Sequence, residues 1–298
     1  MRIVSLLPSA TEIIYALGLE DQLVAVTHEC DYPPDATRKP VITRSLLPAN
    51  LSSAEIDEQV RSQLTSDAHS LYTIDRDLLA RLEPDLIITQ KLCEVCAVAY
   101  DEVLDAIATL PRRPEVLNLE PANLREVLDD IVRVGIAAGQ PETAHSVVAQ
   151  LEERIEKVRL AVSRTDSRPR VGFLEWLAPF FCGGHWNPEL VELAGGEDAI
   201  GRRGQPSMRV EWEQVRAFAP EVMVISCCGF SVERARQDLP ALEAQPGYGD
   251  LPCARDGRVH VVDGAAYFSR PGPRLVDSLE ILARLVHPEV FVESGRAR

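Results

Sequence analysis

The sequence predicts an α/β fold of two similar lobes, and three observations lead to that prediction. The chain opens on an apolar strand, a Pro/Ser loop and a short helix within residues 1–18. A helix end, a proline and an apolar strand occur at 81–89 and again, in the same pattern of residue types, at 217–226. The segment from Asn123 to about Arg164 has apolar residues at helical spacing. We therefore expect an N-terminal lobe over 1–120, a connecting helical segment over 121–167 and a C-terminal lobe over 168–298.

The local signals place the elements of each lobe. Ser9 is expected to cap the first helix, with Glu12 completing a capping box and Gly18 ending the helix. In the second lobe, the strand over 170–175 corresponds to the first strand of the chain, and Asn187 is expected to cap the helix that follows it, with Pro188 at the first helical position. Loops at the carboxyl ends of such strands are where an open α/β sheet places a ligand.

The connecting segment is expected to form a long, rigid helix, broken at Gly139-Gln140-Pro141, and not a flexible linker. Such a connection predicts a stiff pair of lobes with small opening motions and a ligand cleft between them. The polar end over 293–298 is expected to fray.

Composition excludes several classes of function. The 298 residues include 31 basic and 46 acidic side chains, so the net charge of −15 disfavours nucleic acid and anionic membranes as partners. No apolar run approaches the roughly 18 residues of a membrane span, and the amino terminus lacks the features of a signal peptide. The sequence as written therefore predicts a cytoplasmic protein, without membrane insertion and without a disulfide framework.

Aromatic residues are unevenly distributed. The chain has 3 Trp, 6 Tyr and 7 Phe, yet Trp176, Phe180, Phe181 and Trp186 follow one strand closely. The segment 176–186 is expected to be an irregular loop whose rings line a cleft for a large, flat, partly apolar ligand. The alternative is that these rings cap the core of the second lobe.

Cysteines and histidines give weaker signals. Cys93 and Cys96 follow one strand of the first lobe, and Cys227 and Cys228 follow the equivalent strand of the second. These four thiols could hold a metal or cluster or act in redox chemistry, although adjacent cysteines lack the usual spacing of a zinc site, and packing at strand ends remains the alternative.

His28 and His185 each lie in a loop that can face the cleft, as a metal ligand or as solvated loop histidines. No nucleophile, base and orienting residue occur in a known catalytic pattern, so we expect no enzyme.

Three stretches resemble a known family: "RIVSLLPSATEIIYALGLEDQLVAVTHECDYP", "LYTIDRDLLARLEPDLIITQKLCEVCAV" and "VVDGAAYFSRPGPRLVDSLEILARLVHP". Together they look like the cobalamin-binding, BtuF-like branch of the class III periplasmic binding proteins, the substrate-binding components of ABC importers. The pieces "RIVSLLPSATEI" and "LEPDLII" are shared broadly across siderophore, haem and cobalamin binders, whereas "QKLCEVCAV" and "FSRPGPRLVD" point to the cobalamin subgroup. The resemblance implies two Rossmann-like lobes, a long connecting helix and a corrinoid held between the lobes.

The expected function is therefore non-enzymatic binding of cobalamin, as the substrate-binding protein of an ABC importer or as a cytoplasmic carrier or sensor. An ABC permease is the expected partner if the protein is exported to the periplasm. The alternatives are a binder of haem or another metal chelate and a thiol-based metal or redox protein. Three classes of side chain are expected at the ligand: rings that flank it, polar groups for its amide or phosphate groups, and imidazoles that could ligate cobalt. They are Tyr32, Trp176, Phe180, Trp186 and Phe268, then Ser9, Thr11 and Arg270, then His28 and His185.

Overall fold

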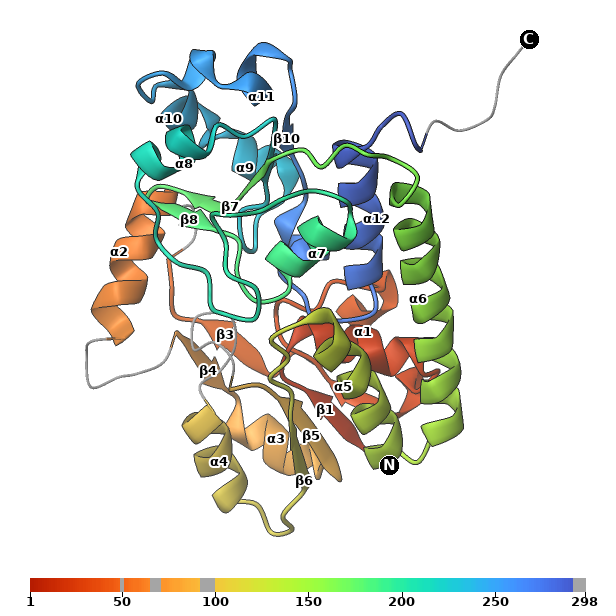
Figure 1. Ribbon diagram of the computed structural model, residues 1–298. Coiled ribbons are helices and arrows are strands. Elements are labelled where there is room, and N and C mark those ends of the chain that lie inside the picture. Colours follow the sequence, from red (N-terminus) through yellow and green to blue (C-terminus); the bar gives the residue numbers. More distant parts are fainter. Residues whose placement is uncertain (49–50, 65–70, 92–99, 292–298) are drawn as a thin grey trace. The chain divides into compact units, whose positions relative to one another are not determined.

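The expected α/β fold is confirmed. The computed structural model describes residues 1–48, 51–64, 71–91 and 100–291, and its contacts divide the chain into two compact units (Figure 1). Unit 1 comprises Met1–Pro121 with Arg125–Ala149, and unit 2 comprises Ala122–Leu124 and the chain from Gln150 onward. No helix in these described ranges is long and apolar enough to span a membrane.

Unit 1 is built on a parallel sheet of four strands in the order β2-β1-β5-β6. These strands are β1 (Ile3–Ser5), β2 (Leu23–Ala25), β5 (Leu86–Thr89) and β6 (Glu115–Asn118). A separate antiparallel pair joins β3 (Thr43–Ser45) to β4 (Tyr72–Ile74). The helices are α1 (Pro8–Ala16), η1 (Glu20–Gln22), η2 (Pro34–Arg38), α2 (Ser53–Leu64), α3 (Arg76–Leu82), α4 (Tyr100–Ala108) and α5 (Leu124–Ala137). The inner strands are fully buried, as continuous apolar runs in a parallel sheet require.

Unit 2 has a second sheet of four strands, in the order β10-β9-β7-β8, with only β8 antiparallel. The strands are β7 (Val171–Leu177), β8 (Phe180–Cys182), β9 (Val222–Ile225) and β10 (Val259–Val261). The helices are α7 (Asn187–Leu193), α8 (Trp212–Phe218), α9 (Val232–Arg236), α10 (Leu239–Glu243), η3 (Tyr248–Asp250), α11 (Pro252–Arg255), the π-helical turn η4 (Gly264–Phe268) and α12 (Leu275–Val286). Helix α7 packs beside α12 (Figure 1).

The duplicated sequence pattern produces the same backbone turn in both units. Helices α3 and α8 end at residues in the left-handed region, Glu83 with φ 42° and Ala219 with φ 49°. A proline follows each, and the next residue donates its backbone N–H to the residue before the first strand of its unit: Asp85 to the carbonyl of Arg2, and Glu221 to that of Arg170 (both 2.8 Å). The side chains of Asp85 and Glu221 accept the N–H groups of those same arginines, at 2.8 and 3.0 Å. The internal duplication therefore extends to individual hydrogen bonds.

Two expected helix caps are wrong. Helix α1 begins at Pro8, with Leu7 at the N-cap position and no side-chain cap, because a proline in the first turn fixes φ for the helix and needs no partner for a missing N–H. Asn187 is the first residue of α7 and not its cap, which is Trp186. The amide of Asn187 instead donates to the carboxylate of Glu175, at 2.6 Å.

The connecting segment is two helices and not one long helix. Helix α5 ends at Ala137, and α6 runs from Pro141 to Val162 after a turn at Gly139, whose φ is 72°. The two helices approach closely, since a Cβ added to Gly135 would lie 2.3 Å from the Cβ of Ala144. All of α5 beyond Leu124 and the start of α6 belong to unit 1, and the rest of α6 belongs to unit 2.

The segment 176–186 is also more regular than expected. Trp176 and Leu177 are the last residues of β7, and they pair with Phe181 and Phe180 of the antiparallel strand β8. Ala178 and Pro179 form the connection, through a cis peptide bond. The aromatic residues therefore alternate between the two faces of a hairpin, which separates them into different environments.

The left-handed residue before β9 gives a prediction about stability. Replacing Ala219 with glycine should stabilise the protein by about 0.5 to 1 kcal/mol, because glycine adopts a positive φ without the steric cost of a Cβ. In contrast, Ala149→Gly at an exposed position inside α6 should destabilise it by about 1 kcal/mol. Urea unfolding midpoints of the two variants measure the difference, and an Ala219→Gly variant as unstable as Ala149→Gly would contradict the proposed cause.

Candidate functional site

Two aromatic rings, tilted by 43° to each other, and a guanidinium lie at the carboxyl end of the sheet of unit 2. The ring centroids of Trp176 and Phe230 are 4.8 Å apart, and the guanidinium carbon of Arg234 lies 4.2 Å from the centroid of Phe230. Trp176 is the second-last residue of β7, and Phe230 comes five residues after the end of β9, so both lie near the edge where the parallel strands end. We call these three residues the aromatic stack.

Backbone contacts hold the aromatic stack in place. The indole N–H of Trp176 donates to the carbonyl of Ala178 at 3.0 Å, and the carbonyl of Phe230 accepts the N–H of Ala265 at 3.1 Å. Arg234 forms an ion pair with Asp238 at 3.1 Å. Both rings are only partly buried against the core of unit 2. These contacts fix the orientation of the two rings before a ligand binds. A flat, apolar ligand face can therefore pack against them.

Sequence reasoning identified Trp176 but missed Phe230 and Arg234. Phe230 lies just beyond Cys227-Cys228, and Arg234 lies four residues after Phe230, in α9. Phe230 precedes Ser231, the N-cap of α9, so helical periodicity does not pair it with Arg234, and the contact depends on the turn before the helix.

Three of the expected ligand-flanking rings are core side chains. Phe180 is 9% exposed and packs on Trp212, with centroids 5.7 Å apart. Trp186 is 5% exposed, and its indole N–H donates to the carbonyl of Phe268 at 2.9 Å. Phe268 is 1% exposed and lies 5.6 Å from the ring of Phe173. For these three rings, the structure of unit 2 supports the alternative interpretation, in which they pack in the core of that unit.

His185 follows the hairpin and precedes α7. Its φ is 50°, and its backbone is fixed by its N–H donating to Gln205 at 2.6 Å and its carbonyl accepting from Gly204 at 2.9 Å. The imidazole centroid is 5.5 Å from the ring of Trp186. Burial lowers the pKa of His185, which keeps the imidazole neutral at pH 7. A neutral imidazole retains the nitrogen lone pair that a metal centre requires.

In unit 1, His28 lies on the antiparallel pair of strands. Its Nδ1 is 2.7 Å from the hydroxyl of Thr43, and its ring centroid is 5.4 Å from that of Tyr72. The other ring nitrogen, Nε2, is 3.4 Å from a carboxylate oxygen of Glu29. Both ring nitrogens of His28 therefore have a polar neighbour within unit 1. Tyr32, nearby in sequence, is 43% exposed.

The polar candidates are more buried than expected. Thr11 is fully buried, its hydroxyl donates to the Oγ of Ser5 at 2.9 Å, and the same oxygen lies 3.1 Å from the Sγ of Cys30. Ser9 is 2% exposed in the first turn of α1. Arg270, 7% exposed, lies after η4. Thr11 is thus occupied within unit 1, which makes it unsuited to binding a ligand phosphate.

Buried thiols cluster in the core of unit 2. Cys182, Cys227 and Cys253 belong to one hydrophobic cluster, and burial raises the pKa of Cys227 to about 12 and that of Cys253 to about 11. Cys228 is only partly buried. Cys93 and Cys96 lie outside the described residues. Within the described ranges, no group of three or more His, Cys, Asp or Glu side chains could hold a metal ion.

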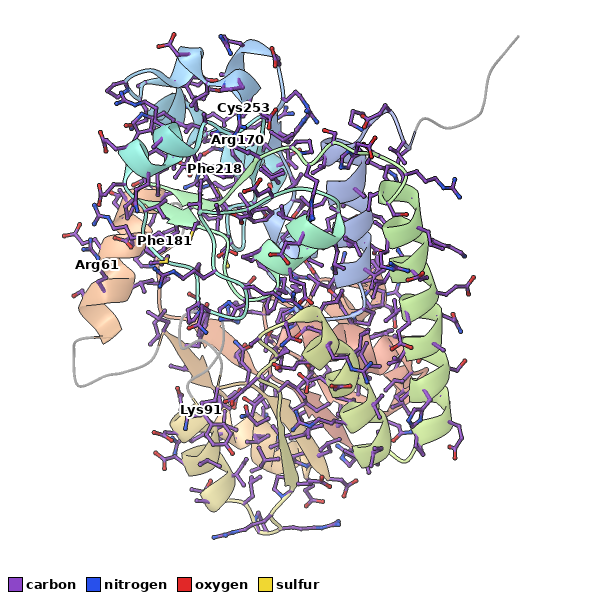
Figure 2. The ribbon with its side chains drawn as sticks, viewed as in Figure 1. Arg61, Lys91, Arg170, Phe181, Phe218 and Cys253 are labelled. Atoms are coloured by element: carbon purple, nitrogen blue, oxygen red, sulfur yellow. The ribbon has the colours of Figure 1, made fainter. Side chains whose placement is uncertain are left out.

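Figure 2 gives the side chains of both units. Lys91, labelled in unit 1, follows β5 and lies with its Nζ 6.0 Å from the centroid of the Tyr100 ring. Phe181 is labelled on β8, and its backbone bridges to Arg209. The structure thus brings His185, Trp186 and Phe268 together in unit 2, and it joins Trp176 to residues that the sequence did not single out.

Comparison with known proteins gives consistent results. Residues 3–266 match the family described as "Periplasmic binding protein". A vitamin B12-binding protein of Yersinia pestis is 28% identical over 228 residues, which cover 76% of this chain and 69% of that protein.

Solved structures share the fold. The periplasmic vitamin B12 binding protein BtuF of Vibrio cholerae superposes with a TM-score of 0.69 and 23% identity, covering 98% of both chains. The periplasmic heme-binding protein RhuT from Roseiflexus sp. RS-1 gives a TM-score of 0.71 and 22% identity, covering 97% of this chain and 98% of that one. With two α/β units and a family match that spans most of its length, the chain belongs to the periplasmic binding protein family.

Proposed function

We propose that this chain is a non-enzymatic substrate-binding protein whose ligand is a corrinoid, with cobalamin as the first candidate. The observation that carries the proposal is the 28% identity over 228 residues to a protein named as binding vitamin B12. An ABC permease is the proposed partner of an exported form, whereas a cytoplasmic form would act as a carrier or sensor.

The aromatic stack supports a large, flat ligand. Trp176 and Phe230 offer partly buried rings at a strand-end edge, where open α/β sheets bind ligands. An apolar ring system gains from burial against such side chains, and each well-packed aromatic contact contributes about 1 to 3 kcal/mol. We therefore propose that the aromatic stack contacts the ligand in place of Phe180, Trp186 and Phe268. Tyr32 and Arg270 remain candidate ligand contacts.

Haem is the second candidate ligand. A heme-binding protein has the same fold at 22% identity, which shows the architecture and leaves the ligand open. The specific feature in its favour is the neutral imidazole of His185, because a neutral histidine is a common haem ligand. The two ligands are distinguishable by their absorption spectra.

The ligand proposal predicts a measurable affinity for cobalamin. Calorimetric titration of the full chain with cyanocobalamin should give a Kd of about 1 μM or lower, roughly 8 kcal/mol of binding free energy. Trp176→Ala should weaken binding by about 1 to 3 kcal/mol if the indole contacts the corrin ring.

The matched control is Phe218→Ala. Phe218, labelled in Figure 2, ends α8 and precedes the amino end of β9, whereas Trp176 lies at the carboxyl end of β7, which runs parallel to β9. Its loss should lower stability without changing the affinity. Equal affinity of the wild type and Trp176→Ala, or an equal loss in both variants, would exclude the aromatic stack as the contact.

A second prediction concerns cobalt ligation. If His28 or His185 replaces a cobalt ligand, the absorption spectrum of bound cobalamin should differ from that of the free vitamin, and the corresponding His→Ala variant should abolish the difference. His145, an exposed histidine on α6, provides the control variant. Identical free and bound spectra would show that neither imidazole ligates the metal.

A third prediction separates corrinoid binding from thiol-based metal chemistry. Since burial raises the pKa of Cys227 to about 12, this thiol stays protonated, and a protonated thiol is a poor metal ligand. Replacing Cys93, Cys96, Cys227 and Cys228 with alanine should leave the cobalamin affinity within about threefold, under 1 kcal/mol. Elemental analysis that finds about one zinc or iron per wild-type chain, lost in the variant, would support the thiol alternative.

A further inference from the structure

A group of buried oxygen atoms lies beside the hairpin in unit 2, away from the aromatic stack that the ligand proposal uses. Its centre is Glu175 of β7, whose carboxylate accepts the backbone N–H of Gly184 at 3.0 Å and the side-chain amide of Asn187 at 2.6 Å. Asn187 is 3% exposed, and its buried Oδ1 has no hydrogen-bond partner among the residues that the structure describes. A buried carbonyl oxygen without a partner costs free energy unless a ligand or water meets it.

Asp198 approaches the same place from the following loop. Its Oδ1 accepts the N–H groups of Ile200 and Gly201, both at 2.9 Å, whereas its buried Oδ2 meets no hydrogen-bond partner in the described parts of the chain. A Cβ built on Gly201 would lie 2.7 Å from the carbonyl oxygen of Gly183 and 2.8 Å from both this Oδ2 and the Cγ of Pro188. Only a residue without a side chain leaves room between these two oxygens.

The peptide group between Gly183 and Gly184 lies close to the carboxyl groups of both Glu175 and Asp198. Its N–H donates to Glu175, and its carbonyl oxygen is the one that faces Asp198. Ser226 adds a further oxygen to this side of the sheet. The pairing of Leu174 with Ile225 places Ser226 next to Glu175 along the strands, and the buried Oγ of Ser226 also lacks a hydrogen-bond partner within the described ranges.

The charges in this group are not balanced by a basic side chain. Burial raises the pKa of Glu175, and it raises the pKa of Asp198 to about 6. The other causes are hydrogen bonds and repulsion between acidic groups; no ion pair with an arginine or lysine of the described residues is among them. With its pKa raised to about 6, Asp198 is largely ionised near neutral pH, and its Oδ2 has no hydrogen-bond donor among the described residues.

We propose that Glu175, Asp198, Asn187 and the carbonyl of Gly183 form a binding site for one Ca²⁺ ion. Carboxylate, amide and carbonyl oxygens are the donors that this hard cation prefers, and it tolerates irregular geometry and completes its shell with water. The bound ion would meet the unpartnered oxygens of Asp198 and Asn187 and offset the negative charge. The site would fix the turn that carries His185 and Trp186, and it does not depend on which ligand the protein binds.

Calorimetric titration of the full chain with CaCl₂, after removal of metal with EDTA, tests the proposal. The wild type should bind about one Ca²⁺ with a Kd of about 1 mM or lower. Asp198→Asn, which removes the charge, and Gly201→Ala, which places a methyl group between the oxygens, should each weaken binding about tenfold or more. Glu197→Gln, at the neighbouring exposed glutamate, and Gly249→Ala, where a Cβ meets no atom within 4 Å, should bind as the wild type does.

A second measurement applies even if a variant does not fold. The thermal midpoint of the wild type should rise with CaCl₂ and should not rise with NaCl at equal ionic strength, because an ion that binds only the folded state stabilises it. No heat of binding at about 10 mM Ca²⁺, or equal affinity in Asp198→Asn and the wild type, would overturn the proposal and assign the group to bound water.

Discussion

The turn that leads into the central strand of each unit is the constraint on which the other features depend. In both units a left-handed residue and a proline end a helix, and the next residue donates its N–H to the carbonyl that precedes the neighbouring strand. This contact sets the parallel register of β1 with β5 and of β7 with β9. Because the register is fixed at the amino ends of the strands, the length of each strand determines which residue lies at its carboxyl end. Thr89 and Ser226 then lie at the edge where α/β proteins bind ligands.

The two units use that edge differently. In unit 1 the first strand leads directly into α1, whose first turn is packed by Pro8 and by the buried hydroxyl of Thr11. In unit 2 the first strand continues into the hairpin of β7 and β8 before α7 begins. The hairpin places Trp176 beside Phe230 and turns the carboxylate of Glu175 toward the Gly183-Gly184 peptide. One longer strand therefore gives unit 2 both its aromatic stack and its group of buried oxygens.

Much of the architecture was predictable because it depends on local patterns. The apolar runs, the duplicated helix-proline-strand motif and the break at Gly139 each act within a few residues, and the structure has all of them. The caps were not predictable, since Asn187 bonds to Glu175, twelve residues away, in preference to the end of its own helix. Nor was the burial of Trp186, which depends on the carbonyl of Phe268 from a distant segment. Periodicity gives the face of an element but not which partner from another part of the chain will meet it.

The identity of the ligand is the claim on which the functional account depends, and competition between the two candidates tests it most directly. The full chain is dialysed to equilibrium against equal concentrations of cyanocobalamin and haemin, and the absorption of the retained ligand is measured. The account predicts that cobalamin is retained at about one equivalent per chain while haemin stays close to its free concentration. Retention of haemin with exclusion of cobalamin would contradict it.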